Sequence, residues 1–214
     1  MGVGGAVGLA AAAVSSGKVV ITPTDTVYGL SAAVFKPAEV AKLEAGERAA
    51  PWAEPVAKLY EIKGRPPQQP SLILARDWQY AAMLTLQPLE RIQEFCEQLD
   101  HPLTALVRAR QDWGPPTTNA KGAVAVRVPK NGLITILLRF CRFLYSASAN
   151  YPAGREPHLL EQVPAPIFAK AGLAIDAGPS PLRESSYLVD FTARPPRPIR
   201  GDARLRAAIE TIWS

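Results

Sequence analysis

The sequence has little cysteine or histidine, with two of each in 214 residues. Cys96 and Cys141 belong to no C-x-x-C pattern and lack histidine at ligand spacing, so we expect two free thiols and neither a disulfide nor a zinc site. Aromatic residues make up only 7% of the chain, which gives a nucleic-acid-binding module little independent support. No apolar run reaches the roughly 18 residues that a membrane span needs. We therefore expect a protein that is soluble and cytoplasmic, without contact with a membrane.

The chain has enough apolar residues for a sizeable core, because 48% of its residues are hydrophobic and 20% are charged. We expect residues 1–214 to form one domain. Lysine and arginine (24) outnumber aspartate and glutamate (19), which gives a net charge of +5 and favours contact with phosphates. The apolar residues 6–16 have no basic segment before them, so we interpret them as a surface helix ended by Gly17 and not as a signal peptide.

Short apolar runs alternate with helix-period segments, which predicts an α/β fold with a mixed sheet flanked by helices. Strands are expected at residues 18–23, 71–75, 103–108, 123–128, 143–148, 172–176 and 186–191. Helices are expected within 38–62, 88–99, 131–142 and 202–213. Residues 45–54 have the composition of an inserted loop, and residues 192–201 that of an extended, basic connector to the last helix.

Three stretches carry residues suited to binding anions. Lys63 and Arg65 flank a glycine where a helix stops, so both cations could meet one phosphate or carboxylate, although a basic helix end is also favoured by the helix dipole. Ser148 and Asn150 follow an apolar strand, where ligands gather in open sheets, although this pattern is also a common turn. Arg127 interrupts an apolar strand, so it extends to an exposed face or points into a pocket.

The stretch "ITPTDTVYGL", residues 21–30, places three threonines and an aspartate around one proline at the end of a strand. Ser/Thr turns could explain these hydroxyls, and a binding site could explain them as well. A fourth stretch, residues 176–191, is a loop rich in serine, glycine and proline, and its backbone N–H groups could form an anion nest.

In their order along the chain, these motifs resemble the YrdC-like family of threonylcarbamoyl-adenylate synthases. The family signature combines P-T-[DE]-T-x-[YF]-G-[LV], K-x-R and S-x-N, which are Pro23 to Leu30, Lys63/Arg65 and Ser148/Asn150 here. The resemblance covers about residues 17–201. It implies an open, twisted α/β sheet with a large basic cavity, the fold shared with dihydroxybutanone phosphate synthase.

The resemblance also implies an activity. Members join L-threonine, bicarbonate or CO₂, and ATP into threonylcarbamoyl-AMP and pyrophosphate, with Mg²⁺ carried by ATP and no direct protein ligands to the metal. A downstream threonylcarbamoyl-transferase complex then modifies tRNA, and contact with tRNA or double-stranded RNA is a further expectation. Because threonine carbamate is already a nucleophile, the site must mainly position its substrates and neutralise phosphate charge.

The resemblance assigns roles to three sets of residues. The catalytic set is Lys63, Arg65 and Arg127. The threonine-binding set is Thr24, Thr26 and Tyr28, with Tyr28 as a wall of the pocket and Gly29 allowing a tight turn. The nucleotide-binding set is Lys63, Arg65, Ser146, Ser148, Asn150, Ser186 and Arg200.

The chain departs from the family pattern at several positions, namely at Asp100-His101, Ala147, Tyr187, Gln69 and the insertion 45–54. These departures keep a second interpretation open, a weakly active or non-catalytic paralogue that binds RNA or a nucleotide. A third, a carbamoyl-transfer module of hydrogenase maturation, needs additional domains.

Overall fold

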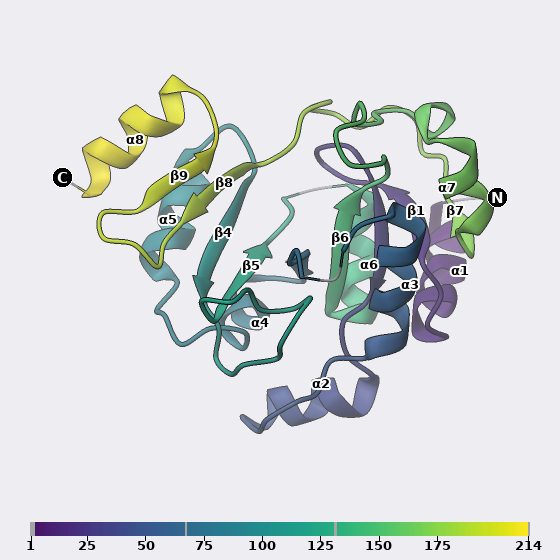
Figure 1. Ribbon diagram of the computed structural model, residues 1–214, viewed down its shortest axis with the longest axis horizontal. Coiled ribbons are helices and arrows are strands. Elements are labelled where there is room, and N and C mark those ends of the chain that lie inside the picture. Colours follow the sequence, from purple (N-terminus) through teal and green to yellow (C-terminus); the bar gives the residue numbers. More distant parts are fainter. Residues whose placement is uncertain (1–2, 67, 131, 214) are drawn as a thin grey trace.

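The computed structural model describes residues 3–66, 68–130 and 132–213. Within them one mixed sheet has the strand order β7-β1-β2-β6-β3-β5-β4-β8-β9 (Figure 1). The strands are β1 (Val20–Pro23), β2 (Tyr28–Ala33), β3 (Leu72–Ala75), β4 (Leu103–Arg108), β5 (Ala123–Arg127), β6 (Phe143–Ser148), β7 (Leu173–Ala174), β8 (Tyr187–Asp190) and β9 (Arg197–Arg200). The predicted α/β class with a mixed sheet and flanking helices is confirmed.

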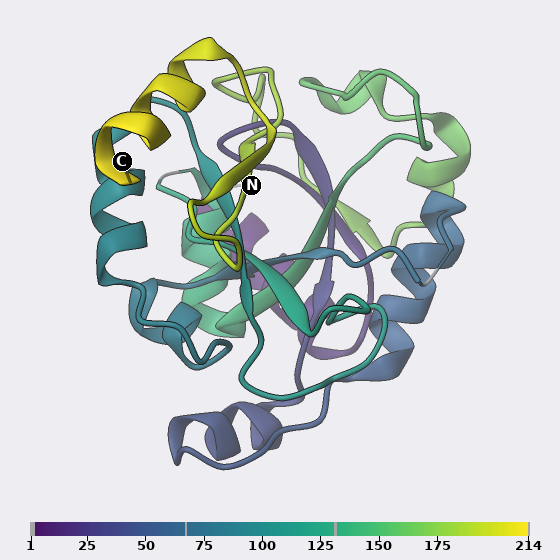
Figure 2. The same cartoon turned by 60° about the vertical axis from the view of Figure 1, so that its left-hand side comes forward.

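The helices are α1 (Val3–Ser15), α2 (Pro37–Glu44), α3 (Ala53–Lys63), α4 (Trp78–Ala82), α5 (Glu90–Gln98), α6 (Leu133–Cys141), α7 (Ala165–Lys170) and α8 (Ala203–Trp213), with a 3₁₀ turn at Leu160–Gln162. Helices α1 and α8 lie at opposite ends of the long axis of the molecule (Figure 1). In the second view α2 projects from the lower edge (Figure 2). No helix of the described residues is long and apolar enough to cross a membrane.

The buried side chains form two apolar clusters. In one, α1 and α6 pack on each other and on the sheet through residues such as Val14, Leu137 and Leu144. The other is larger and includes Tyr28 of β2, Leu59 of α3 and Phe95 of α5. Strands whose side chains are buried on both faces read as continuous apolar runs, which is why most of the sheet could be predicted from the sequence.

Several expected boundaries need correction. The helices expected within parts of 38–62 are α2 and α3, and residues 45–52 between them, most of the loop expected at 45–54, have no regular structure; only Ala53 and Glu54 of that range belong to α3 instead. The connector 192–201 contains the edge strand β9, because its backbone pairs with β8. Strand β2 was not predicted, since its residues were interpreted as a turn motif. Residue 131, the start of an expected helix, lies outside the described residues.

The expectation that Gly29 allows a tight turn also needs correction. It lies inside β2, where it pairs with Thr22 of β1 and Ser148 of β6. A Cβ atom at this position would lie 3.2 Å from Ser146 Oγ and 3.4 Å from Ala147 O. The glycine therefore allows close contact between side-chain and backbone atoms of β6 and β2.

Candidate active site

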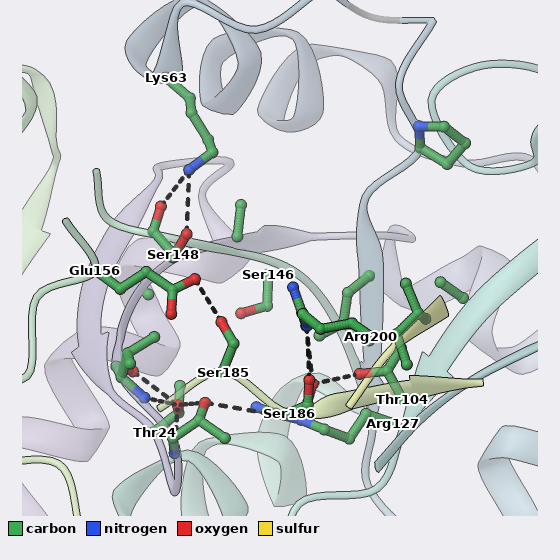
Figure 3. A pocket seen from close by; sticks show the side chains of 18 of the residues that line it. Thr24, Lys63, Thr104, Arg127, Ser146, Ser148, Glu156, Ser185, Ser186 and Arg200 are labelled. Atoms are coloured by element: carbon green, nitrogen blue, oxygen red, sulfur yellow. Dashed lines mark hydrogen bonds between the residues drawn. The ribbon is translucent and has the colours of Figure 1, made fainter. Parts of the chain in front are cut away.

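A cavity of about 220 Å³ lies on one face of the sheet. Its walls come from seven strands, from β2 to β9 in sheet order, and from the loops at their ends. The close-up shows these side chains pointing into one space from distant parts of the chain (Figure 3). Nine predicted site residues line it: Thr24, Thr26, Lys63, Arg65, Arg127, Ser146, Ser148, Ser186 and Arg200.

The floor of the cavity consists of small side chains from neighbouring strands. In the sheet register Gly29 pairs with Ser148, and Leu72 pairs with Ser146 on one side and Ala125 on the other. Side chains on adjacent paired residues share a face of the sheet. A row of glycine, alanine and serine therefore leaves an open space above the sheet, where larger residues would fill it.

The threonine motif forms the turn between β1 and β2. Thr24 Oγ1 accepts hydrogen bonds from the backbone N–H groups of Thr26 (3.1 Å) and Val27 (3.2 Å), and it donates to Val27 O (2.7 Å). The Thr26 hydroxyl lies 2.8 Å from Thr24 Oγ1, and either oxygen could donate in this contact. The two hydroxyls are thus hydrogen-bonded to each other and to the backbone of the turn.

Lys63 is the last residue of α3, and the left-handed Gly64 that follows (φ 61°) ends the helix. Its ammonium group donates to the carbonyl oxygens of Ser148 (2.6 Å) and Asn150 (2.8 Å) just beyond β6. The pKa of Lys63 is lowered to about 8, mainly by burial and to a smaller extent by nearby Arg65, while Glu156 opposes the shift. The fold thus holds a partly desolvated cation at the cavity wall.

Arg65 follows Gly64 and is less buried than Lys63. Its Nε donates to Gln69 Oε1 (3.1 Å), and one terminal nitrogen donates to Pro70 O (2.8 Å). Gln69 stands where the family pattern has a lysine, so in this chain the neighbouring side chain orients Arg65 instead of adding a further charge.

Arg127 is buried at the end of β5, where it meets Asp25 of the β1–β2 turn. The Nη2 to Oδ1 distance is 3.1 Å, and both side chains are almost fully buried. Arg127 Nη1 also donates to Thr26 Oγ1 (3.2 Å). Burial lowers the pKa of Arg127 and Asp25 acts in the opposite direction. Of the two interpretations from sequence, the structure shows an arginine aimed inward.

A second polar group lies at the far side of the cavity, on β4, β8 and β9. Arg200 Nε donates to Ser186 O (2.9 Å), and the hydroxyls of Ser186 and Thr104 are 2.8 Å apart. Ser186 and Thr104 are buried, whereas Arg200 lies on the edge strand. These contacts fix the orientation of a fourth cation toward the same space as Lys63, Arg65 and Arg127 (Figure 3).

Two predicted site residues do not line the cavity. The Tyr28 hydroxyl donates to Gly178 O (2.7 Å), and the side chain is fully buried in the apolar core. Asn150 donates to Gly154 O (2.6 Å), and its backbone carbonyl accepts from Lys63. Asn150 therefore acts on the cavity through Lys63 and the turn that follows β6.

The sequence interpretation missed other residues of the site. Thr104, Glu156 and Ser185 line the cavity, and Asp25 is paired with Arg127 beneath it. Thr104 could have been recognised from the sequence, because it is a polar residue within an apolar strand. Glu156 and Ser185 lie in loops, where no periodic pattern shows which way a side chain points.

The cavity, with four cations and several hydroxyls on an open mixed sheet, defines a binder of anionic or phosphorylated substrates. The Sua5/YciO/YrdC family model, described as "Telomere recombination", matches residues 49–201. The chain belongs to this family, which confirms the family expected from the motifs.

Three known proteins are informative, one by its sequence and two by their structures. A Mycobacterium tuberculosis protein, provisionally named a threonylcarbamoyl-AMP synthase, is 28% identical over 89% of this chain and 81% of its own length. The crystal structure of Pyrococcus abyssi Sua5 complexed with L-threonine is 26% identical, with a TM-score of 0.74 over 91% of this chain. The chain spans about half (53%) of that longer structure. Escherichia coli YciO shares the fold, with a TM-score of 0.70 at 16% identity over 92% of this chain and 91% of its own.

Proposed function

We propose that the chain is a threonylcarbamoyl-AMP synthase, which joins L-threonine, bicarbonate or CO₂, and ATP into threonylcarbamoyl-AMP and pyrophosphate. The observation that carries the proposal is the convergence of Lys63, Arg65, Arg127 and Arg200 on one hydroxyl-lined cavity. The relatives named threonylcarbamoyl-AMP synthases support it.

The chemistry asks for charge neutralisation and positioning. A carbamate oxygen of the carboxylated threonine attacks the α-phosphorus of ATP, and the bond to the β-phosphate oxygen breaks as pyrophosphate leaves. Lys63 and Arg65 lie on one side of the cavity and Arg200 on the other, so fixed cations can neutralise the phosphates and the leaving group together.

The hydroxyl groups supply orientation. Ser146 and Ser148 lie on β6 and line the cavity, and the Lys63 ammonium group contacts Ser148, so both hydroxyls can hold phosphate oxygens or water bound to Mg²⁺. Thr26 can accept a hydrogen bond from threonine while Arg127 holds it in place. Mg²⁺ would arrive bound to ATP, and its charge would be added to that of the four cations.

The wider setting follows from this activity. The product would pass to a threonylcarbamoyl-transferase complex in the cytoplasm for tRNA modification, with contact to tRNA or double-stranded RNA at the basic surface. We also propose that residues 1–214 form a single functional domain, since the sheet and the cavity use strands from most of the chain.

Pyrophosphate release from ATP and Mg²⁺, with threonine and bicarbonate each supplied or omitted, tests the proposal. We expect release only when both are present, and none from Lys63→Ala, because alanine removes the cation. The matched control is Lys58→Ala, which removes an exposed lysine of the same helix, paired with Glu61. ATP binding without threonine-dependent release would instead favour the non-catalytic paralogue.

A further inference from the structure

Glu156 stands out among the described residues that line the cavity, because it is the acidic member of a set with four cations. It lies in the loop after β6 and points toward the space shared with Ser148 and Lys63 (Figure 3). The phosphate groups of ATP and pyrophosphate and the bicarbonate ion are anionic, so these charged groups do not explain a carboxylate here. An α-amino acid, by contrast, brings an ammonium group together with its carboxylate.

The carboxylate of Glu156 is close to the cations yet is not paired with them. Its negative charge opposes the lowering of the Lys63 pKa that burial and Arg65 cause. Within the described residues, however, no ion pair of 4.0 Å or less includes Glu156. Oε1 instead accepts a hydrogen bond from the Ser185 hydroxyl on the opposite loop.

The backbone of Ser185 is held in place by His101. Its backbone carbonyl accepts a hydrogen bond from His101 Nε2 (2.8 Å), and the His101 ring stacks on Tyr187 with ring centroids 4.2 Å apart. His101 and Tyr187 are both departures from the family pattern noted in the sequence. The chain thus holds one carboxylate oxygen away from Lys63 with a neutral donor and leaves the other for a ligand.

We propose that Glu156 binds the ammonium group of the amino-acid substrate and thereby selects zwitterionic α-amino acids over plain carboxylates. This inference rests on the proposed function. The substrate carboxylate lies among the cations, and its ammonium group donates to the free oxygen of Glu156 in a charge-assisted hydrogen bond. Glu156 is therefore a specificity-determining residue.

Calorimetric titration of the whole chain with L-threonine and with 3-hydroxybutyrate, which is threonine without its amino group, tests this role. We expect the wild type to prefer threonine by about 10-fold or more, the usual contribution of a hydrogen bond to a charged group. Glu156→Gln should lose most of that preference and leave 3-hydroxybutyrate affinity unchanged or higher. Ser185→Ala provides a second, milder variant and should reduce the preference in part.

The matched control is Glu184→Gln, which removes an exposed negative charge next to Ser185 but outside the cavity. An unchanged threonine preference in Glu156→Gln overturns the inference alone. The inference also fails if that variant instead raises the Mg²⁺ concentration needed for ATP binding, since Glu156 would then serve the metal. A wild type that binds neither compound overturns the proposed function as well.

Discussion

At the scale of the residue, the buried pair of Asp25 and Arg127 links the structure of the site to its stability. Both side chains are almost fully buried, and both Asp25 oxygens lack a hydrogen bond within the described residues despite the 3.1 Å contact between charges. A buried charge without its partner is far less stable than the pair. The pair therefore holds Arg127 in place at the cavity, and the stability of the fold depends on both side chains.

We predict that Asp25→Asn lowers the free energy of unfolding by about 3 kcal/mol, because it leaves the Arg127 charge unpaired in the interior. The double variant Asp25→Asn/Arg127→Met should be more stable than the sum of the two single changes implies. Urea denaturation of the three variants measures this coupling. Additive effects would show that the two side chains do not depend on each other.

Lys63 gives the site a pH dependence. Because its pKa is lowered to about 8, mainly by burial, the cation at the cavity wall is lost in mildly alkaline solution, well below the ordinary range of lysine. ATP affinity should therefore fall as the pH rises through about 8. For stability the sign is opposite, because the unfolded chain keeps the proton up to the ordinary lysine pKa, so this group makes folding more favourable as the pH rises above 8.

Titration of ATP binding between about pH 6.5 and 9.5 checks the first effect. Lys63→Arg should flatten the alkaline decrease, since a guanidinium group keeps its charge there. The control is Lys58→Gln, which alters an exposed lysine of α3 and should leave the profile unchanged. A wild-type profile that is flat across this range would contradict the role of Lys63.

The site residues that could be predicted from sequence are those whose chemistry conflicts with their local surroundings. An arginine in an apolar strand or a lysine and an arginine around a helix-ending glycine can be recognised without knowing the fold. Asp25 and Glu156 could not be assigned in this way, since their roles depend on contacts with Arg127 and Ser185, which are distant in sequence.

At the scale of the element, β9 shows how a functional cation can lie in a segment that resembles a linker. Its sequence, Arg197 to Arg200, contains a proline, which is tolerated at a sheet edge but not in a central strand. Local composition therefore predicted an extended connector, and only the pairing with β8 makes it a strand. Strand β2 was missed for a related reason, because its first residues carry the turn motif.

Gly201 connects β9 to α8 and follows Arg200 directly. Its φ of 157° disfavours residues with a side chain, and a Cβ atom would lie 2.3 Å from Leu205 Cδ2 and 3.2 Å from Tyr187 Cδ1. We predict that Gly201→Ala destabilises the protein by about 1–3 kcal/mol, because the backbone is strained and the Leu205 side chain must move. We also predict weaker ATP binding, because the strain lies next to Arg200.

Thermal denaturation and ATP titration of Gly201→Ala measure the two effects. Gly46→Ala is the matched control, since Gly46 also has a positive φ (79°) but no atom within 4 Å of the Cβ position. The control should show only backbone strain and no loss of ATP affinity. Equal losses in both variants would mean that packing around Gly201 has no part in placing Arg200.

At the scale of the whole molecule, the insertion expected at 45–54 is hydrogen-bonded to other segments of the fold, on a side that does not border the cavity. Ala49 O accepts hydrogen bonds from Gln111 (2.7 Å) and from the Trp113 ring (3.0 Å), and Trp52 N–H donates to Val34 O (2.7 Å). None of the described residues lining the cavity comes from this segment. This departure from the family pattern therefore contributes no described residue to the walls of the cavity.

The cavity walls come from strands on both sides of the sheet centre, so a bound ligand holds together segments from residue 24 to residue 200. A ligand that binds only the folded state stabilises it by mass action, by about 2.7 kcal/mol at 100 times its Kd, which is roughly 5–10 °C in Tm for a chain of this size.

We predict a shift of this size in Tm with ATP, and a further increase when threonine and bicarbonate are added. Lys63→Ala should lose the ATP-dependent shift and Lys58→Ala should retain it. Because the proposed site needs both Arg200 on β9 and Lys63, which contacts the end of β6, a truncated chain without β8 and β9 should show no shift even if it folds. A full shift in that truncation would place the nucleotide on the β2–β6 side alone.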